Sequence, residues 1–156
     1  MPGLNRVGIA DDDQIAQADE LVNRLLWGPG TDNLLAQEDV TALTSDGVVN
    51  WALTDNLGSV RDLVQYDSVA DETKNVRHVT YEAFGTVVEV TNLSDPTASA
   101  VDTIFAYTAR ALDADTGLQN NWHRWYDTPT GQWLSTDPIE DDYNNTYRYV
   151  GNNPTN

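Results

Sequence analysis

The sequence contains no cysteine, which excludes disulfide bonds, cysteine-ligated metal sites and a thiolate nucleophile. Basic residues are scarce, with 8 Lys and Arg against 25 Asp and Glu, and the formal charge is −17. That charge repels a phosphate backbone, so we expect no nucleic-acid partner. No apolar run approaches the roughly 20 residues of a membrane span, and residues 1–13 lack the basic and apolar regions of a signal peptide. We therefore expect no membrane span, and these features point to no cofactor.

The excess of acidic residues has three explanations. It is a general solvation or salt-adaptation bias, an electrostatic match to a cationic partner or cargo, or a means of binding divalent cations. The acids are spread along the chain rather than clustered, which favours the first explanation.

Phe and Met are also rare, at two and one, so the apolar residues are mainly Val, Leu, Ala, Trp and Tyr. This composition favours sheet. Three of the five Trp and four of the seven Tyr lie within residues 122–154, between turn-forming dipeptides. Aromatic residues between tight turns predict short strands with sharp reversals.

Short extended runs separated by turn residues recur along the whole chain. Asp46-Gly47 and Gly85 mark two hairpin turns, the second with a positive φ at Gly85. Residues 59–66 are ambiguous between strand and helix, and a short helix over 13–26, capped by Asp13, competes with a strand at 21–27. The other expected strands are 33–39, 40–44, 48–54, 75–81, 86–91, 102–109, 119–126, 132–135 and 146–150, with a loop at 92–100 and turns at 113–117 and 128–131. Strands without intervening helices imply an all-β fold of antiparallel hairpins.

Several segments resemble the Rhs/YD-repeat family, specifically its Rhs-repeat-associated core region. The segments, in the family's order, are WGPGTDNLLA at 27–36, LTDNLGSVR at 53–61 with Asn56 where His is usual, YEAFGTVV at 81–88, LDADTGL at 112–118, RWYD at 124–127, GQWLS at 131–135, DPI at 137–139 and YRYVGNNP at 147–154. No single motif is very specific, but eight in the right order and spacing are. The resemblance covers about residues 21–156 and favours the strand over the helix at 21–27.

The resemblance implies a structural role. YD repeats form β-hairpins that wind into a hollow shell around a toxic or otherwise folded C-terminal cargo, and neighbouring hairpins stabilise one another. We expect a loose segment at 1–20, a core fragment at 21–156, a YD-like hairpin at 76–91 and a closing segment at 103–156. The fragment is expected to form a curved sheet or plug, and its exposed edges favour self-association. Its expected partners are the remainder of the shell or the cargo, and the family implies a secreted or cell-surface location.

The family also ends in a self-cleaving pair of aspartates, in two Asp-Pro-x-Gly motifs separated by 18 residues. Paired carboxylates suit peptide hydrolysis because one can stay protonated while the other acts as a base. Here Asp137-Pro138-Ile139-Glu140 matches the first motif, with Glu140 in place of Gly, and the second motif would fall beyond Asn156. We predict that residues 1–156 do not cleave themselves. Asp137 is either half of a catalytic pair or a turn residue that caps its own backbone before Pro138.

Other candidate sites are weaker. His78 and His123 have no third ligand nearby in the sequence, so no metal site is expected. Asp113 and Asp115 are spaced like the start of a calcium loop, but Arg124 stands where a bidentate Glu is required, and a turn is the better interpretation. The acids Glu140, Asp141 and Asp142 are interpreted as a solvated loop.

Three functions therefore remain open from sequence. The first is a structural shell fragment without a complete catalytic site, and the second an aspartyl self-processing domain completed by further residues. The third, a carbohydrate-binding β-domain with Trp and Tyr platforms, rests only on aromatic content.

Overall fold

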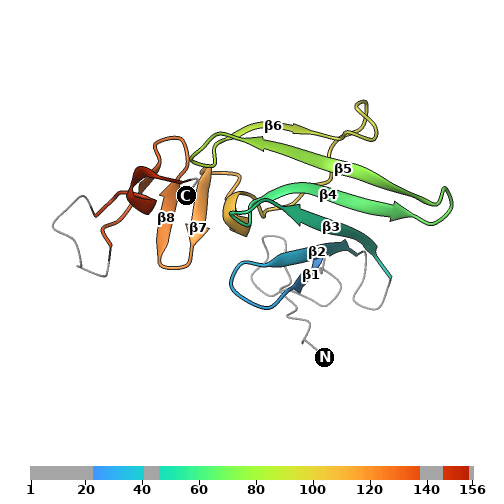
Figure 1. Ribbon diagram of the computed structural model, residues 1–156, viewed down its shortest axis with the longest axis horizontal. Helices are drawn as coiled ribbons and strands as arrows, with labels where there is room; N and C mark the ends of the chain where they lie inside the picture. The colour runs from blue at the N-terminus through green and yellow to red at the C-terminus, as the bar shows by residue number, and fades with distance from the viewer. Residues whose placement is uncertain (1–22, 41–45, 138–145, 155–156) are drawn as a thin grey trace.

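A computed structural model of the chain describes residues 23–40, 46–137 and 146–154. The expected loose segment at 1–20, residues 13–22 of the alternative helix and the acidic loop at 140–145 lie outside the described residues. The larger of two sheets is a six-stranded antiparallel meander in the order β1-β2-β3-β4-β5-β6 (Figure 1). Its strands are β1 (Asn23–Trp27), β2 (Leu34–Asp39), β3 (Val48–Thr54), β4 (Val60–Asp67), β5 (Glu72–Tyr81) and β6 (Val87–Thr91). The strand at 21–27 is confirmed for residues 23–27, and the ambiguous segment at 59–66 is a strand.

The expected hairpin at 75–91 is confirmed. β5 pairs with β6 from His78↔Thr91 to Tyr81↔Val87, and a turn at 82–85 joins them. Gly85 has φ 91°, and a Cβ there would lie 2.5 Å from the ring of Tyr107. Glycine is therefore required at this turn both by backbone conformation and by space.

The hairpin expected around Asp46-Gly47 has a different partner strand. β3 pairs with β2 on one side, from Ala36↔Trp51 to Asp39↔Val48, and with β4 on the other. β2 and β4 therefore occupy both edges of β3, and residues 41–44 of the expected strand lie outside the described residues. The backbone N–H of Gly47 instead donates to Glu38 Oε1 at 2.9 Å, and Gly47 lies close to the end of β2. The Asp46-Gly47 signal correctly indicated that the chain reverses before β3, but it did not indicate that the partner strand, β2, ends as early as Asp39.

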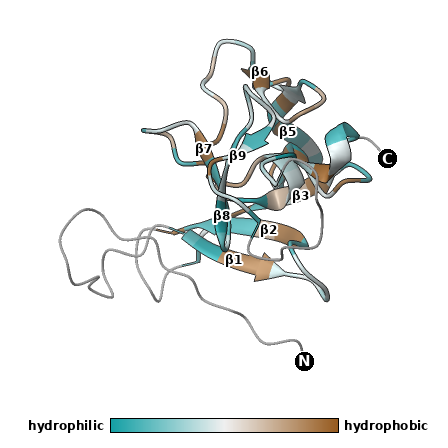
Figure 2. Ribbon diagram, turned by 90° about the vertical axis from the view of Figure 1, so that its left-hand side faces the viewer, coloured by the Kyte–Doolittle hydropathy of each residue, from teal (hydrophilic) through white to brown (hydrophobic). Residues whose placement is uncertain are grey.

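One face of the large sheet carries the aliphatic core. Leu25, Leu34, Val60, Leu63, Val76 and Ala109 form a buried cluster, with Trp27, Ala52, Val101 and Phe105 packed against it. On β3 the alternate residues Val49, Trp51 and Leu53 are exposed instead. β3 is therefore apolar at exposed as well as core positions, and Figure 2 shows apolar residues on several other strands.

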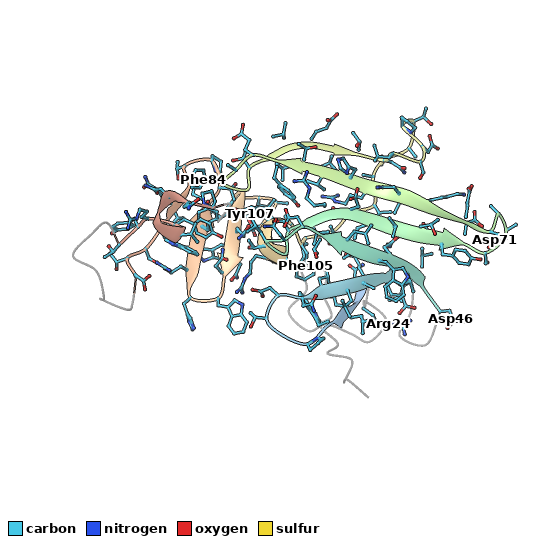
Figure 3. The ribbon with its side chains drawn as sticks, in the orientation of Figure 1. Arg24, Asp46, Asp71, Phe84, Phe105 and Tyr107 are labelled. Atoms are coloured by element: carbon cyan, nitrogen blue, oxygen red, sulfur yellow. The ribbon has the colours of Figure 1, made fainter. Side chains whose placement is uncertain are left out.

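The strand expected at 102–109 is wrong. This segment crosses the core face irregularly, with an isolated bridge between Phe105 and Ala111 and a 3-10 turn at Tyr107–Ala109. Thr108 and Ala109 both have φ 52°, which no strand can accommodate. The Thr108 N–H donates to Ser59 Oγ at 3.1 Å, and Phe105 and Tyr107 pack into different clusters (Figure 3). Packing against two separate cores overrides the strand propensity of these residues.

The second sheet is smaller and lies at one end of the first (Figure 1). It contains β7 (Leu118–Asn121), β8 (Arg124–Asp127) and β9 (Gln132–Trp133). The single strand expected at 119–126 is therefore wrong, because Trp122 at φ 63° reverses the chain into a hairpin. The strand at 132–135 is shorter than expected, and 146–150 makes only the isolated bridge Gln132↔Arg148 before a 3-10 turn at Val150–Asn152. The turns at 113–117 and 128–131 and the loop at 92–100 are confirmed.

A cluster of aromatic side chains joins the two sheets. Tyr107, Tyr126 and Tyr149 are buried together, with Tyr81, Phe84 and Trp133 packed around them. The Tyr126 and Tyr149 rings lie 4.3 Å apart between centroids. The Tyr126 hydroxyl donates to Phe84 O at 2.9 Å and the Tyr107 hydroxyl to Ala83 O at 3.1 Å, so both tyrosines hold the turn between β5 and β6. The fold is all-β and antiparallel, as expected.

Candidate functional site

Asp137, the expected aspartate, lies four residues after Trp133, where β9 ends. Its Oδ2 is 3.0 Å from Arg124 Nη1 on β8, and its backbone N–H donates to Thr146 O at 3.2 Å. The contact with Arg124 joins opposite charges without the alignment of a hydrogen bond. Pro138, Ile139 and Glu140 lie outside the described residues. The structure therefore gives Asp137 a cationic neighbour, which sequence reasoning missed.

Arg124 is held from a second side by an aromatic ring. Its guanidinium carbon lies 4.0 Å from the centroid of Trp133, a cation–π distance. Because β8 and β9 are paired, Arg124 and Trp133 come from neighbouring strands. In the sequence, Arg124 belongs to the RWYD motif at 124–127, but that motif does not indicate a contact with Asp137. Arg124 therefore places a positive charge beside the carboxylate of Asp137.

The two histidines occupy different environments. His78 Nδ1 is 2.6 Å from Asp62 Oδ1, and the same oxygen accepts from Asn75 Nδ2 at 2.7 Å. His123 is exposed at the tip of the β7–β8 hairpin. Within residues 23–40, 46–137 and 146–154, no three His, Asp or Glu side chains come close enough together to hold a metal ion.

Asp113 belongs to a turn, as expected. Its Oδ1 accepts from the N–H of Thr116 at 2.8 Å and from the Thr116 hydroxyl at 2.6 Å. These hydrogen bonds, the side-chain one most, lower the pKa of the carboxyl. Arg124, at the position where a calcium loop requires a Glu, turns to Asp137 instead. Asp113 therefore stabilises its own turn.

An aromatic cleft separates the β1–β2 connection from the β7–β8 hairpin. It has a volume of about 700 Å³. Trp27 meets Phe105 edge-on, with centroids 5.1 Å apart, and Trp122 is 71 % exposed at the hairpin tip. Arg110 lies 5.2 Å from the Trp122 ring centroid and forms an ion pair with Asp32 at 2.6 Å. Burial raises the pKa of Asp32, and Arg110 partly offsets that effect. Sequence reasoning missed this cleft because it placed Trp122 within a strand.

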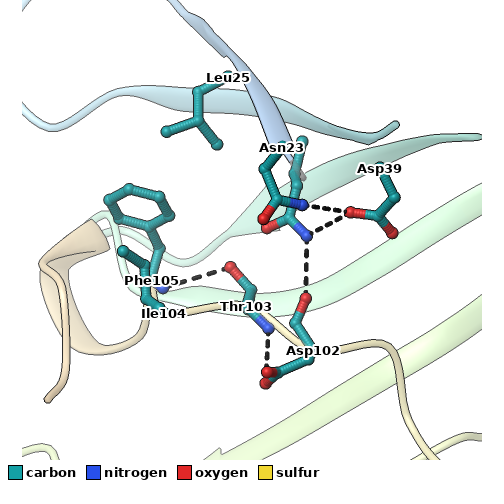
Figure 4. Close-up of a pocket in the computed structure, with 8 residues that line it drawn as sticks. Asn23, Leu25, Asp39, Asp102, Thr103, Ile104 and Phe105 are labelled. Carbon is teal, nitrogen blue, oxygen red and sulfur yellow. Dashed lines mark hydrogen bonds between the residues drawn. The ribbon is translucent and has the colours of Figure 1, made fainter. Parts of the chain in front are cut away.

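A smaller cavity, of about 280 Å³, adjoins this cleft and shares Leu25, Ile104 and Phe105 with it (Figure 4). Asp39 lies at its polar end. Asp39 Oδ1 accepts from Asn23 Nδ2 at 2.6 Å and from Gln37 Nε2 at 2.7 Å. Gln37 Nε2 also donates to the backbone oxygen of Asp102, at 2.9 Å.

The sequence model of the Teneurin YD-shell family matches residues 36–155. The chain belongs to the Teneurin YD-shell family. The matched range includes β3 to β9, the aromatic cluster and Asp137. No curated protein matches this YD-shell chain.

Solved structures share the fold. A crystal structure of TcdB2-TccC3-Cdc42 matches with a TM-score of 0.63 at 20% identity, over 85% of this YD-shell chain and 6% of that chain. A crystal structure of TcdB2-TccC3 matches with a TM-score of 0.62 at 22% identity, and the match covers 85% of this chain and 6% of that chain. The structure of the Photorhabdus luminescens Tc holotoxin pore with a TccC3 variant matches with a TM-score of 0.59 at 19% identity. This match covers 86% of this chain and 7% of that chain. This chain therefore spans only 6–7% of the length of these chains, and the likeness concerns the fold.

In the part of this YD-shell chain that the structure describes, no helix has the length and apolarity of a membrane span.

Proposed function

We propose that this chain forms part of the wall of an Rhs-type shell that encloses or presents a C-terminal effector. The observation that carries the proposal is the open six-stranded meander, in which β1 and β6 pair on one side only among the described strands. Sheets that continue through stacked hairpins have such edges, and each hairpin depends on its neighbours. The family match and the fold shared with Tc toxin structures support a shell role.

The exposed side chains of β3 support the same proposal. Val49, Trp51 and Leu53 lie at alternate positions and are exposed, with Trp51 at 47 %. Within a shell wall this surface contacts further wall or cargo, whereas on a free domain it favours association. We assign residues 21–156 to the Rhs core fragment and residues 1–20 to the segment preceding it, in a secreted or cell-surface protein. Its partners in this proposal are the remaining shell and the effector.

Self-association tests this role. Light scattering after size exclusion should show that the mass of the chain rises with concentration, and that Trp51→Ser reduces the rise. Trp122→Ser is the matched control, since Trp122 is exposed on a different element and should leave the association unchanged. A chain that stays strictly monomeric at high micromolar concentration contradicts the wall role.

A second candidate is the aspartyl self-processing domain, which the pairing of Asp137 with Arg124 supports. A carboxylate is one half of an acid–base pair, and further residues would supply the other. The chain extended by its native downstream residues should then lose a C-terminal fragment, detected by mass spectrometry. Asp137→Asn should abolish that loss and Asp95→Asn, on a distant loop, should preserve it. Unchanged cleavage in Asp137→Asn would exclude this candidate.

A further inference from the structure

We propose that the smaller cavity, beside Asp39, binds the primary ammonium group of an alkylamine, either a lysine side chain or a free amine. The cavity lies between β1, β2 and the segment 102–105 (Figure 4). Its eight lining residues are Asn23, Leu25, Gln37, Asp39, Asp102, Thr103, Ile104 and Phe105. None of them is basic, whereas two are acidic. This inference is independent of the proposed shell role.

Three amides surround the carboxylate of Asp39 without a cation. Asn23 and Gln37 donate to Oδ1, and Asn50 donates to Oδ2 at 2.9 Å. Within the described ranges Asp39 forms no ion pair. Its negative charge is therefore met only by the positive ends of neutral amide dipoles.

The same arrangement leaves amide oxygens free. In an amide group the oxygen and the NH₂ point in different directions, so donation of the NH₂ to Asp39 turns each oxygen away from that carboxylate. The described part of the chain supplies no hydrogen bond to the side-chain oxygens of Asn23 and Gln37, both of which line the cavity. Asn50, which does not line the cavity, is buried, and its Oδ1 also lacks a described partner. The oxygens of Asn23 and Gln37 are therefore acceptors that a donor group inside the cavity can reach.

The rest of the cavity determines which donor fits. An ammonium group has three N–H donors and no acceptor, and it complements amide oxygens oriented by a carboxylate. Leu25, Ile104 and the Phe105 ring form an apolar wall, which suits an alkyl chain, and an aromatic face attracts a cation. A bare metal ion would leave this apolar wall unused, and a volume of about 280 Å³ exceeds what a single ion fills.

The aromatic cleft adjoins the smaller cavity. The two share Leu25, Ile104 and Phe105, so an alkyl chain that lies along Phe105 would extend towards the cleft. Two other cations are close by and are already engaged. Arg110 pairs with Asp32, and Arg77, which interacts with Asp102, donates to Val101 O at 2.9 Å. An incoming ammonium therefore meets Asp39 as the unmatched charge at the far end of the cavity.

Titration with n-hexylammonium, followed by NMR of the side-chain amide groups, tests the proposal. The Asn23 and Gln37 NH₂ resonances should shift saturably, whereas n-hexanol, which has the same chain without the charge, should cause no such shift. Asp39→Asn should weaken binding about tenfold or more. Asp95→Asn removes the same charge from a distant exposed loop and should leave the affinity unchanged. Phe105→Leu, which keeps an apolar wall, should weaken binding less than Asp39→Asn and remains informative if Asp39→Asn does not fold.

Two further binding experiments distinguish a lysine side chain from a free amine, and an ammonium site from a metal-cation site. Binding of Nα-acetyl-lysine amide, but not of the norleucine analogue, supports a lysine side chain, whereas binding of hexylammonium alone supports a free amine. Equal binding of hexanol, or unchanged affinity in folded Asp39→Asn together with Phe105→Leu, would overturn the proposal. Displacement of hexylammonium by equimolar potassium would also overturn it, because the site would then be one for a metal cation.

Discussion

The hydroxyl of Tyr126 on β8 donates a hydrogen bond to the backbone oxygen of Phe84, 42 residues earlier, at 2.9 Å. Tyr126 is fully buried, and Phe84 lies in the turn between β5 and β6. This hydrogen bond therefore connects the small sheet to the turn of the β5–β6 hairpin in the large sheet.

Tyr126→Phe should lower the free energy of unfolding by about 1–2 kcal/mol, because the ring remains while the oxygen of Phe84 loses a buried donor. Urea unfolding measures this loss. Tyr66→Phe removes a hydroxyl that donates to Asp71 on the exposed β4–β5 connection and should change the midpoint little. Equal effects of the two variants would show that the bond to Phe84 does not connect the sheets.

Gly85→Ala should destabilise the chain by about 3 kcal/mol, since φ 91° is strained for alanine and the new Cβ would lie 2.5 Å from Tyr107. Gly117→Ala is the matched control. Gly117 also has a positive φ, 70°, but nothing lies within 4 Å of its Cβ position, so a loss of about 1 kcal/mol is expected. Thermal unfolding of both variants separates the steric contribution from the backbone contribution. A Gly85→Ala protein as stable as Gly117→Ala would mean that Tyr107 can move aside.

Local signals in the sequence predicted most of the large sheet. Turn residues such as Gly85 and the β-branched runs beside them specify a hairpin within a few residues, and that information is local. Residues 102–109 predict a strand, but Phe105 and Tyr107 pack into two different clusters, and neighbours in sequence do not specify that packing. Trp122 was misassigned for a similar reason, since a bulky residue at φ 63° carries no turn signal.

The candidate sites also divide into those that a local motif indicates and those that depend on long-range strand pairing. Asp137 was found through its motif, whereas its partner Arg124 and the Asp39 cavity depend on strand pairing. Asn23, Gln37 and Asn50 are far apart in sequence or on opposite sides of a connection, and only the register of β1, β2 and β3 brings them to one carboxylate. No spacing in the sequence contains that information.

Alkaline pH should unfold the protein through its aromatic cluster. Burial raises the pKa of Tyr81 and of Tyr107 from 10 to about 12, and it raises the pKa values of Tyr126 and Tyr149 as well. Because the folded-state pKa lies above the unfolded-state value of about 10, the contribution to stability is complete below pH 10 and is lost as pH rises towards 12. Each such tyrosine lowers the free energy of unfolding by up to about 1.4 kcal/mol per pH unit in that window.

Urea midpoints at pH values from 8 to 12, together with phenolate absorbance, measure this effect. Stability should fall above pH 10, and the buried tyrosines should ionise only on unfolding. Tyr126→Phe should reduce the slope, because one ionising group is removed. A midpoint independent of pH up to 12 contradicts the assigned burial of these hydroxyls.

Arg124→Ala should destabilise the chain more than Asp137→Asn does. Arg124 loses both the Trp133 ring, 4.0 Å away, and Asp137, whereas Asp137→Asn removes only one partly exposed charge and keeps an acceptor. Partly exposed ion pairs contribute about 1 kcal/mol or less, so the coupling energy from a double-mutant cycle of the two variants should lie below about 1 kcal/mol. Urea unfolding of the two single variants and the double variant provides the cycle.

Arg124→Lys keeps the charge but loses the planar contact with Trp133, and its free energy of unfolding should lie close to that of Arg124→Ala if stacking dominates. A coupling well above that value would instead show that the contact between Arg124 and Asp137, rather than the ring, fixes β8 against the segment after β9.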